Sequence, residues 1–239
     1  MSNKLVIIPT FNEKENIQKI LQAVLDLPVS FDILVVDDNS QDGTADIVKR
    51  MQSAFVDRIH LLQRPGKLGL GTAYIAGFRY GLEHKYGFIY EMDADFSHNP
   101  NDLVRMNEVL ESNVADVVIG SRYIQGGSVV NWPANRRFIS YGGSLYTRLI
   151  TWMPVKDPTA GFVGYSAKVL SALDLSKIHF IGYAFQIQMK FEAWSLGFKI
   201  KEIPIVFKDR EEGTSKMNGG IVKEAALGVL AMKLKKLRS

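Results

Sequence analysis

Short apolar runs alternate with amphipathic stretches through the first 120 residues of the chain. The apolar runs are rich in Val, Ile and Leu, which is typical of strands, and the stretches between them carry apolar residues at helical spacing. The predicted strands are Leu5–Pro9, Asp32–Val36, Ile59–Gln63, Phe88–Met92 and Val117–Gly120, and the predicted helices are Glu13–Leu27, Thr44–Phe55, Gly69–His84 and Asn101–Glu111. This order predicts an α/β fold with a mostly parallel central sheet and helices on both faces.

The second half of the chain has a less regular pattern. Helical spacing over Trp132–Trp152 and Phe185–Trp194 predicts two helices, and Phe198–Phe207 is interpreted as a strand. The polar stretch Lys208–Gly220 contains Gly and predicts a loop. Ile221–Leu237 again has helical spacing, with basic residues near its end, so we expect a final amphipathic helix.

Polar residues follow three of the predicted strands, at the point where each strand ends. These segments are Thr10–Glu13, Asp37–Ser40 and Asp93–Asp95. Ligands of open α/β sheets bind at the carboxyl ends of the strands, so we expect the three segments to line one crevice. After the second segment, Asp42 or Gly43 can cap the following helix. Asp37 and Asp38 are then left without a structural reason for being acidic.

Asp93 and Asp95 are one residue apart at the end of a predicted strand. Residues i and i+2 of a strand project to the same side, and two carboxylates there repel each other unless a cation lies between them. A hard divalent ion, completed by phosphate oxygens, would remove that repulsion. The alternative is a solvated turn rich in Asp.

The segment Arg64–Ala73 has the glycine spacing of a dinucleotide-binding turn, because it follows a predicted strand and begins a helix. The third glycine position is occupied by Tyr74, which is too large for close packing of a helix on a strand. The segment also follows the third strand rather than the first. We therefore disfavour a dehydrogenase, and the backbone amides with Lys67 could instead bind a phosphate.

Composition and charge narrow the choice of partner. The 239 residues are 46% apolar and contain no Cys, so the chain can bury a substantial core but has no thiol chemistry. No apolar run approaches the roughly 18 residues of a membrane span. The net charge of +4 comes from residues 199–239, which hold 10 Lys/Arg and 5 Asp/Glu. Because basic residues are not interleaved with aromatic ones, we do not expect the protein to bind nucleic acid. We interpret the basic C-terminal end as facing acidic lipid or a phosphorylated acceptor.

Arginine is the more informative basic residue near the expected crevice. Arg122 directly follows a predicted strand end, and Arg136 and Arg137 are adjacent. His98, beside the acidic pair, is the one candidate for a catalytic histidine, and a turn histidine is its alternative interpretation. Arginines grouped around a site without a general base indicate an anionic acceptor.

Taken together, these motifs resemble the GT-A glycosyltransferases of family 2, and within them the dolichyl/polyprenyl-phosphate mannose synthases. This chain has Gln188 where that family often has Glu. The residues that carry the resemblance are Ile8–Glu13, Val36–Ser40, Lys67–Ala73, Met92–His98, Gly120–Tyr123, Asn131–Pro133, Arg136–Arg137, Asp157–Phe162, Phe185–Ile187 and Arg210–Lys216.

The resemblance implies a GT-A (Rossmann-like) catalytic domain over residues 1–218 and a basic amphipathic C-terminal helix over residues 219–239. It implies a nucleotide-sugar site formed by Pro9, Thr10, Phe11, Glu13, Val36, Asp38, Lys67, Asp93, Ala94 and Asp95. It implies Mg2+ or Mn2+ held by Asp93, Asp95 and Ser97, with Asp93, Asp95 and Arg122 as the catalytic residues. It implies an acceptor-phosphate site formed by Arg122, Arg136, Ser140, Arg210 and Lys216.

The implied reaction is inverting transfer of mannose from GDP-mannose to a dolichyl or polyprenyl phosphate. A phosphate monoester is already ionised at neutral pH, since its second pKa is about 6, and therefore needs positioning rather than a general base. The expected partners are a membrane surface, or a membrane-protein subunit, at the cytoplasmic face of a membrane. Two alternatives stay open: a synthase of the same kind that uses a UDP-sugar, and a non-catalytic sugar-nucleotide-binding module.

Overall fold

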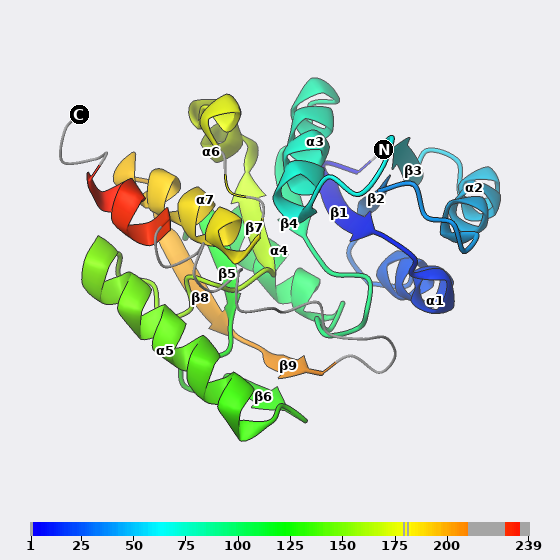
Figure 1. Cartoon of the computed structure of the whole chain (residues 1–239). Helices are drawn as coiled ribbons and strands as arrows, with labels where there is room; N and C mark the ends of the chain where they lie inside the picture. Colours follow the sequence, from blue (N-terminus) through cyan, green and yellow to red (C-terminus); the bar gives the residue numbers. More distant parts are fainter. Residues whose placement is uncertain (1, 179, 181, 210–227, 235–239) are drawn as a thin grey trace.

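A seven-stranded sheet in the order β3–β2–β1–β4–β7–β5–β8 forms the centre of the molecule (Figure 1). The structure is a computed structural model that describes residues 2–178, 180, 182–209 and 228–234. The strands of this sheet are β1 (Lys4–Thr10), β2 (Asp32–Asp37), β3 (Ile59–Gln63), β4 (Phe88–Glu91), β5 (Val117–Ser121), β7 (Val163–Ser166) and β8 (Ile200–Pro204). Only β7 runs antiparallel to its neighbours, so the predicted mostly parallel sheet is confirmed.

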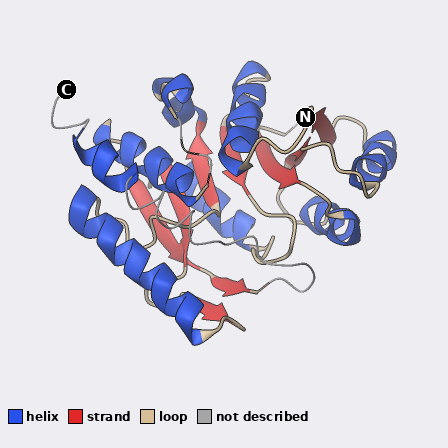
Figure 2. Ribbon diagram, viewed as in Figure 1, coloured by secondary structure: helices blue, strands red, loops and turns tan. Residues whose placement is uncertain are grey.

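Helices cover both faces of the sheet (Figure 2). They are α1 (Lys14–Leu25), α2 (Thr44–Ala54), α3 (Leu70–Glu83), α4 (Asp102–Glu111), α5 (Ala134–Thr151), α6 (Ala167–Ala172) and α7 (Tyr183–Ser195), with a 3-10 turn, η1, at Leu175–Lys177. Along β1, Leu5 and Ile7 pack into the core with α3 and α7, whereas Val6 and Ile8 pack into the core with α1, α2 and α4. This is the alternation that a strand buried on both faces requires. None of the helices within the described ranges combines the length and apolar character needed to cross a bilayer.

The antiparallel strand β7 lies between β4 and β5, and its backbone approaches both neighbours closely. A Cβ atom added to Gly164 would lie 2.8 Å from the ring of Tyr90 and 2.9 Å from the side chain of Val118. Glycine is therefore required at this position, and the side chains of β4 and β5 fill the space instead.

The strand predicted over Phe198–Phe207 is interrupted. It divides into β8 and β9 (Val206–Lys208), and β9 leaves the main sheet to pair in parallel with β6 (Ser128–Val130). Pro204 ends β8 because proline has no N–H to continue a strand ladder. The small β6–β9 sheet lies between the edge of the main sheet, where β8 ends, and the start of α5 (Figure 1).

The predicted C-terminal helix is described only in part. Residues 228–234 are helical; Val229 and Met232 are buried, and Leu230 and Leu234 are exposed. One side of this turn therefore packs on the domain. The proposed domain boundary after residue 218 lies outside the described residues.

Candidate active site

The three polar segments predicted to share a crevice follow strands that are neighbours in the sheet. β2, β1 and β4 are adjacent and parallel, so their carboxyl ends lie at the same edge. Backbone hydrogen bonds continue past the strands: the Asp38 N–H donates to the Thr10 carbonyl at 3.0 Å, and the Met92 N–H to the Ile7 carbonyl at 3.1 Å. The prediction that these segments lie at one edge is confirmed, because neighbouring parallel strands have their carboxyl ends on the same side of the sheet.

Asp37 has a structural role, so the interpretation that it lacks one was wrong. Its side chain is fully buried and accepts hydrogen bonds from the Thr10 hydroxyl at 2.8 Å and the Ser40 hydroxyl at 2.6 Å. The Ser40 N–H donates to the other carboxylate oxygen at 3.0 Å. Asp37 therefore joins the ends of β1 and β2 and is not available to a ligand.

Asp38 faces the glycine-containing segment that follows β3. Arg64 donates to Asp38 Oδ1 from both Nε and Nη2, at 2.6 and 2.5 Å, and the Leu68 N–H donates to Oδ2 at 3.2 Å. Beside this pair, Lys67 Nζ lies 4.7 Å from the centre of the Phe11 ring. Three of the predicted nucleotide-binding side chains, from different strand ends, thus meet around this segment. Arg64, which no site prediction included, orients Asp38.

Asp93 and Asp95 begin the loop after β4. The side chain of Asp93 is 32% exposed, and Asp95 Oδ1 accepts a hydrogen bond from the Ser97 N–H at 3.1 Å. The hydroxyl of Ser97 is buried and has no hydrogen-bond partner among the residues that the structure describes. Two carboxylates and one unpartnered hydroxyl suit a hard divalent cation, which prefers oxygen ligands. In the described part of the chain no three His, Cys, Asp or Glu side chains gather as a metal site, so donor oxygens and water would complete the coordination.

His98 supports this loop from within. Burial lowers its pKa to about 4, so the ring is neutral, and its Nδ1 accepts a hydrogen bond from the Asp93 N–H at 3.2 Å. The ring stacks on Phe162 at a centroid distance of 4.8 Å and meets Phe207 edge-on at 5.4 Å. These contacts agree with the alternative interpretation of His98 as a turn histidine. They hold the backbone of Asp93 in place.

Arg122, the residue after β5, is held in a buried ion pair. Its Nε and Nη2 donate to the two carboxylate oxygens of Asp157 at 2.8 and 2.7 Å, and its backbone N–H donates at 2.9 Å. Burial acts to raise the pKa of Asp157, but the charge and hydrogen bonds of Arg122 outweigh it and hold that pKa below its ordinary value. The sequence pattern did not pair Asp157 with Arg122, because 35 residues separate them.

Aromatic rings connect Arg122 with the other predicted acceptor-binding residues. Trp132 lies 5.6 Å from the guanidinium of Arg122 and 4.1 Å from that of Arg136. The hydroxyl of Tyr123 donates to Ser140 Oγ at 2.7 Å. Arg122, Arg136 and Ser140 are thus brought together, while Arg210 and Lys216 lie outside the described residues. Their roles in acceptor binding stay predictions.

The acidic and the arginine-rich parts of the site share one aromatic neighbour. Phe207, on β9, contacts the ring of His98 and also lies 5.6 Å from the guanidinium of Arg122. The small β6–β9 sheet therefore joins the loop of Asp93 to the residues around Arg122. This contact between distant segments gives the two halves of the site a fixed relation.

A second buried polar cluster was missed by the sequence analysis. Gln186 Nε2 donates to Glu91 Oε2 at 2.6 Å, and Lys190 Nζ donates to the carbonyl of Ala160 at 2.7 Å and to Gln186 Oε1 at 3.2 Å. Burial raises the pKa of Glu91 and lowers that of Lys190, and each charge offsets part of the shift of the other. The sequence signal was Lys190, which lies between the apolar residues Met189 and Phe191 in the predicted helix Phe185–Trp194.

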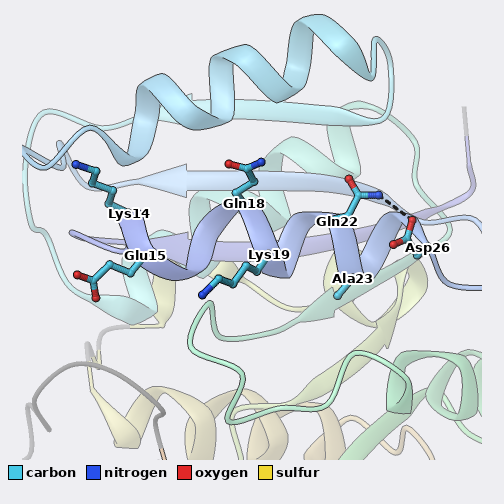
Figure 3. Close-up of a pocket in the computed structure, with 7 residues that line it drawn as sticks. All are labelled: Lys14, Glu15, Gln18, Lys19, Gln22, Ala23 and Asp26. Carbon is cyan, nitrogen blue, oxygen red and sulfur yellow. Dashed lines mark hydrogen bonds between the residues drawn. The ribbon is translucent and has the colours of Figure 1, made fainter.

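A shallow groove of about 630 Å³ runs along the exposed face of α1 (Figure 3). Its lining residues are Lys14, Glu15, Gln18, Lys19, Gln22, Ala23 and Asp26. These side chains come from successive turns of one helix, and their main internal contact is a 2.8 Å hydrogen bond from Gln22 to Asp26. The groove is a solvated helix surface and holds none of the predicted site residues.

Comparison of the chain with known proteins identifies the class of protein to which this fold and these strand-end carboxylates belong. The chain matches the family described as "Glycosyl transferase family 2" over residues 5–174. It belongs to this family and is a glycosyltransferase, as predicted.

Two relatives resemble the chain over most of their length. Undecaprenyl-phosphate mannosyltransferase of Micrococcus luteus is 48% identical over 225 residues, which cover 94% of this chain and 91% of that protein. Polyprenol monophosphomannose synthase of Mycolicibacterium smegmatis is 44% identical over 225 residues, which cover 94% of this chain and 84% of that protein.

Solved structures with low sequence identity share the fold. Glucosyl-3-phosphoglycerate synthase from Mycobacterium tuberculosis, in complex with Mn2+, UDP and phosphoglyceric acid, superposes with a TM-score of 0.70 at 16% identity, covering 96% of this chain and 78% of that one. A mannosyltransferase from Pyrobaculum calidifontis in complex with GDP-Man and Mn2+ has a TM-score of 0.60 at 14% identity, covering 99% and 74%. The predicted GT-A-like architecture is confirmed.

Proposed function

We propose that this glycosyltransferase moves mannose from GDP-mannose to a polyprenyl or dolichyl phosphate. The observation that carries the proposal is the arrangement around Phe207, whose ring contacts His98, the residue hydrogen-bonded to the Asp93 backbone, and also lies 5.6 Å from the guanidinium of Arg122. Two relatives, 48% and 44% identical to this chain, are named for mannose and a polyprenyl phosphate or polyprenol, which supports both the donor sugar and the acceptor.

The donor would lie at the ends of β1, β2 and β4. Asp38, oriented by Arg64, would accept hydrogen bonds from the base or ribose, and Phe11 with Lys67 would form the adjoining wall. Asp93, Asp95 and Ser97 would hold Mg2+ or Mn2+ against the diphosphate. When bound, this ion would neutralise charge that develops on the departing nucleoside diphosphate.

The acceptor phosphate would bind near Arg122, Arg136 and Ser140. A phosphate monoester carries its negative charge at neutral pH and attacks without losing a proton to a base. His98 is neutral, and its Nδ1 is engaged by the Asp93 backbone, so it suits a supporting role. Direct attack at the anomeric carbon would invert its configuration. Because Asp157 already neutralises part of the charge on Arg122, the phosphate would keep more of its nucleophilicity.

The test is transfer of radiolabelled mannose from GDP-mannose to a polyprenyl phosphate in detergent, with UDP-glucose as the competing donor. We expect Mn2+- or Mg2+-dependent product from GDP-mannose that a chelator abolishes. Thermal-shift titrations of GDP and UDP with Mn2+ provide an independent measurement of donor binding. Stabilisation by UDP but not GDP would refute the mannose assignment, and binding without turnover would favour a non-catalytic module.

A further inference from the structure

Tyr74 occupies the third glycine position of the segment that has the spacing of a dinucleotide-binding turn. In such turns the third glycine lets the helix pack closely on a strand. In this chain the close approach occurs further along α3. A Cβ atom added to Gly77 would lie 2.7 Å from the side chain of Ile7 on β1. One added to Gly81 would lie 2.6 Å from the side chain of Ile89 on β4. Position 74 is therefore free to carry a large side chain.

The ring of Tyr74 is fully buried among other aromatic rings. It stacks on Phe185 of α7 at a centroid distance of 6.1 Å, and on Phe78, one turn further along α3, at 6.3 Å. Phe78 also packs against Phe185, without a hydroxyl, so a ring in this cluster does not need one. A buried hydroxyl costs free energy unless it is hydrogen-bonded. The hydroxyl of Tyr74 thus needs a reason beyond packing.

The hydroxyl of Tyr74 donates to Oδ1 of Asp93 at 3.4 Å. Within the described residues this is the one hydrogen bond that the hydroxyl makes. The other supports of the loop act on its backbone or on Asp95: His98 accepts from the Asp93 N–H, and the Ser97 N–H donates to Asp95. Tyr74 therefore contacts the carboxylate of Asp93 itself.

We propose that Tyr74 is a positioning residue, which holds the carboxylate of Asp93 in the orientation that a divalent cation needs. The inference rests on the proposed function, which gives this cation to Asp93. Groups that hydrogen-bond to metal ligands orient them, and loss of such a group lowers metal affinity about 10- to 100-fold. The 3.4 Å separation is long for an O–H···O bond, so we expect the lower end of this range.

Helix α3 also begins at the segment that contacts Asp38. The N–H of Leu68, just before the helix, donates to Asp38 Oδ2 at 3.2 Å, and Tyr74 lies one turn into the helix. One helix thus connects a side chain proposed to contact the nucleoside with one proposed to hold the cation. Tyr74 sets the cation side of this connection, as binding of a diphosphate between the two requires.

The test is titration of the full chain with Mn2+ in saturating GDP, with free Mn2+ measured by electron paramagnetic resonance. Tyr74→Phe keeps the ring and removes the hydroxyl, so the Kd for Mn2+ should rise about 10-fold. Tyr86→Phe is the matched control. It also removes a buried hydroxyl from a carboxylate, since Tyr86 donates to Asp32 at 3.0 Å, but Asp32 begins β2 at the opposite end of the sheet from Asp93. Its Kd should equal that of the unaltered chain.

Excess metal separates positioning from a loss of folding. In the transfer assay, an increase of about 10-fold in Mn2+ should restore the rate of Tyr74→Phe, whereas a rate that stays low would contradict the inference. An unchanged Kd in Tyr74→Phe, or an equal rise in both variants, would overturn the inference and leave the proposed function intact.

Two further outcomes distinguish the inference from the proposed function. If the unaltered chain bound no Mn2+, the inference would fall together with the proposed metal site. If the Kd rose only in Tyr74→Phe while the unaltered chain transferred no mannose, the inference would hold and the proposed function would fail.

Discussion

Residues 4–121, proposed to bind the donor and called the donor-side half, and residues 122–209, proposed to bind the acceptor and called the acceptor-side half, position charged groups in different ways. In the donor-side half, Asp93 and Asp95 follow the end of a parallel strand, and backbone amides and a neighbouring ring hold their loop. In the acceptor-side half, Arg122 depends on Asp157, a fully buried carboxylate from a distant turn. A strand end and backbone N–H groups thus present the charges of Asp93 and Asp95, whereas a buried ion pair presents that of Arg122.

This difference has consequences for stability. The Asp93 side chain is partly exposed and the Asp95 carboxylate accepts a backbone N–H, so neutralising either charge should affect chemistry more than folding. A buried charge has lost its hydration, and removal of its partner leaves that loss uncompensated. We therefore expect function and stability to be separable on the donor side and coupled on the acceptor side.

The largest effect is expected from Asp95→Asn. The amide oxygen can still accept from the Ser97 N–H, but a neutral side chain would hold a divalent cation poorly. The metal contributes several kcal/mol to the transition state, so kcat should fall on the order of 10⁴-fold. The melting temperature should change by less than about 2 °C. Steady-state kinetics and thermal denaturation measure the two quantities.

Asp46→Asn serves as the control for this variant, because that carboxylate is 71% exposed on α2. Its kinetics should match the unaltered chain. Full activity of Asp95→Asn, or activity that a chelator leaves unchanged, would show that the strand-end carboxylates are a solvated turn.

The next effect is expected from Asp157→Ala, which leaves the buried guanidinium of Arg122 unpaired. The free energy of unfolding should fall by about 3–5 kcal/mol, together with the affinity for the acceptor. Denaturant titration measures the first, and acceptor KM the second. Asp174→Asn, at an exposed ion pair with Lys177, should lower the free energy of unfolding much less, because solvent screens that pair. If Asp157→Ala and Asp174→Asn were equally stable, the acceptor side would not depend on its buried pair.

The same pair predicts a pH dependence with a defined sign. The pKa of Asp157 is lowered from its ordinary value of 3.8, so its stabilisation is fully present above pH 3.8 and is lost as the pH falls through the lower, folded-state value. A double variant, Arg122→Met with Asp157→Leu, should lose this part of the acid sensitivity. It should also unfold at a higher denaturant concentration than Asp157→Ala while staying inactive.

The local sequence pattern predicted the helices and strands of the donor-side half because each of them has its own hydrophobic periodicity. The paired strand ends followed from the parallel order, without knowledge of tertiary contacts. The insertion of β7 beside β4 did not follow, because an apolar run does not specify its partner or direction. The separation of β9 from β8 at Pro204 was also missed.

Contacts between distant residues explain the errors at the site. Arg122 was predicted, but its partner Asp157 was not, since nothing local couples a strand end to a turn 35 residues away. Lys190 and Glu91 approach each other from α7 and β4 for the same reason. The structural role of Asp37 was missed because it depends on Thr10, which belongs to another strand.

A smaller effect is expected from Lys190→Met. The change removes a buried charge whose pKa burial already lowers, but it leaves the carbonyl of Ala160 unsatisfied, at a cost of about 1–3 kcal/mol in unfolding free energy. Ala160 lies in the turn that carries Asp157, so acceptor KM should rise a few-fold while donor KM stays constant. Lys49→Met, at an exposed position, is the control. Equal changes in both KM values would exclude a link specific to the acceptor side.

The smallest effect is expected from Gln18→Ala with Lys19→Ala in the groove along α1. Both side chains are exposed, and neither follows a strand end nor takes part in a buried pair. Such surface changes alter the free energy of unfolding by less than about 0.5 kcal/mol, and the rate of transfer should stay within a factor of two. A larger loss of activity would show that polar side chains contribute to transfer without a strand end or a buried ion pair to position them. The contrast between the two halves would then not explain how the site is built.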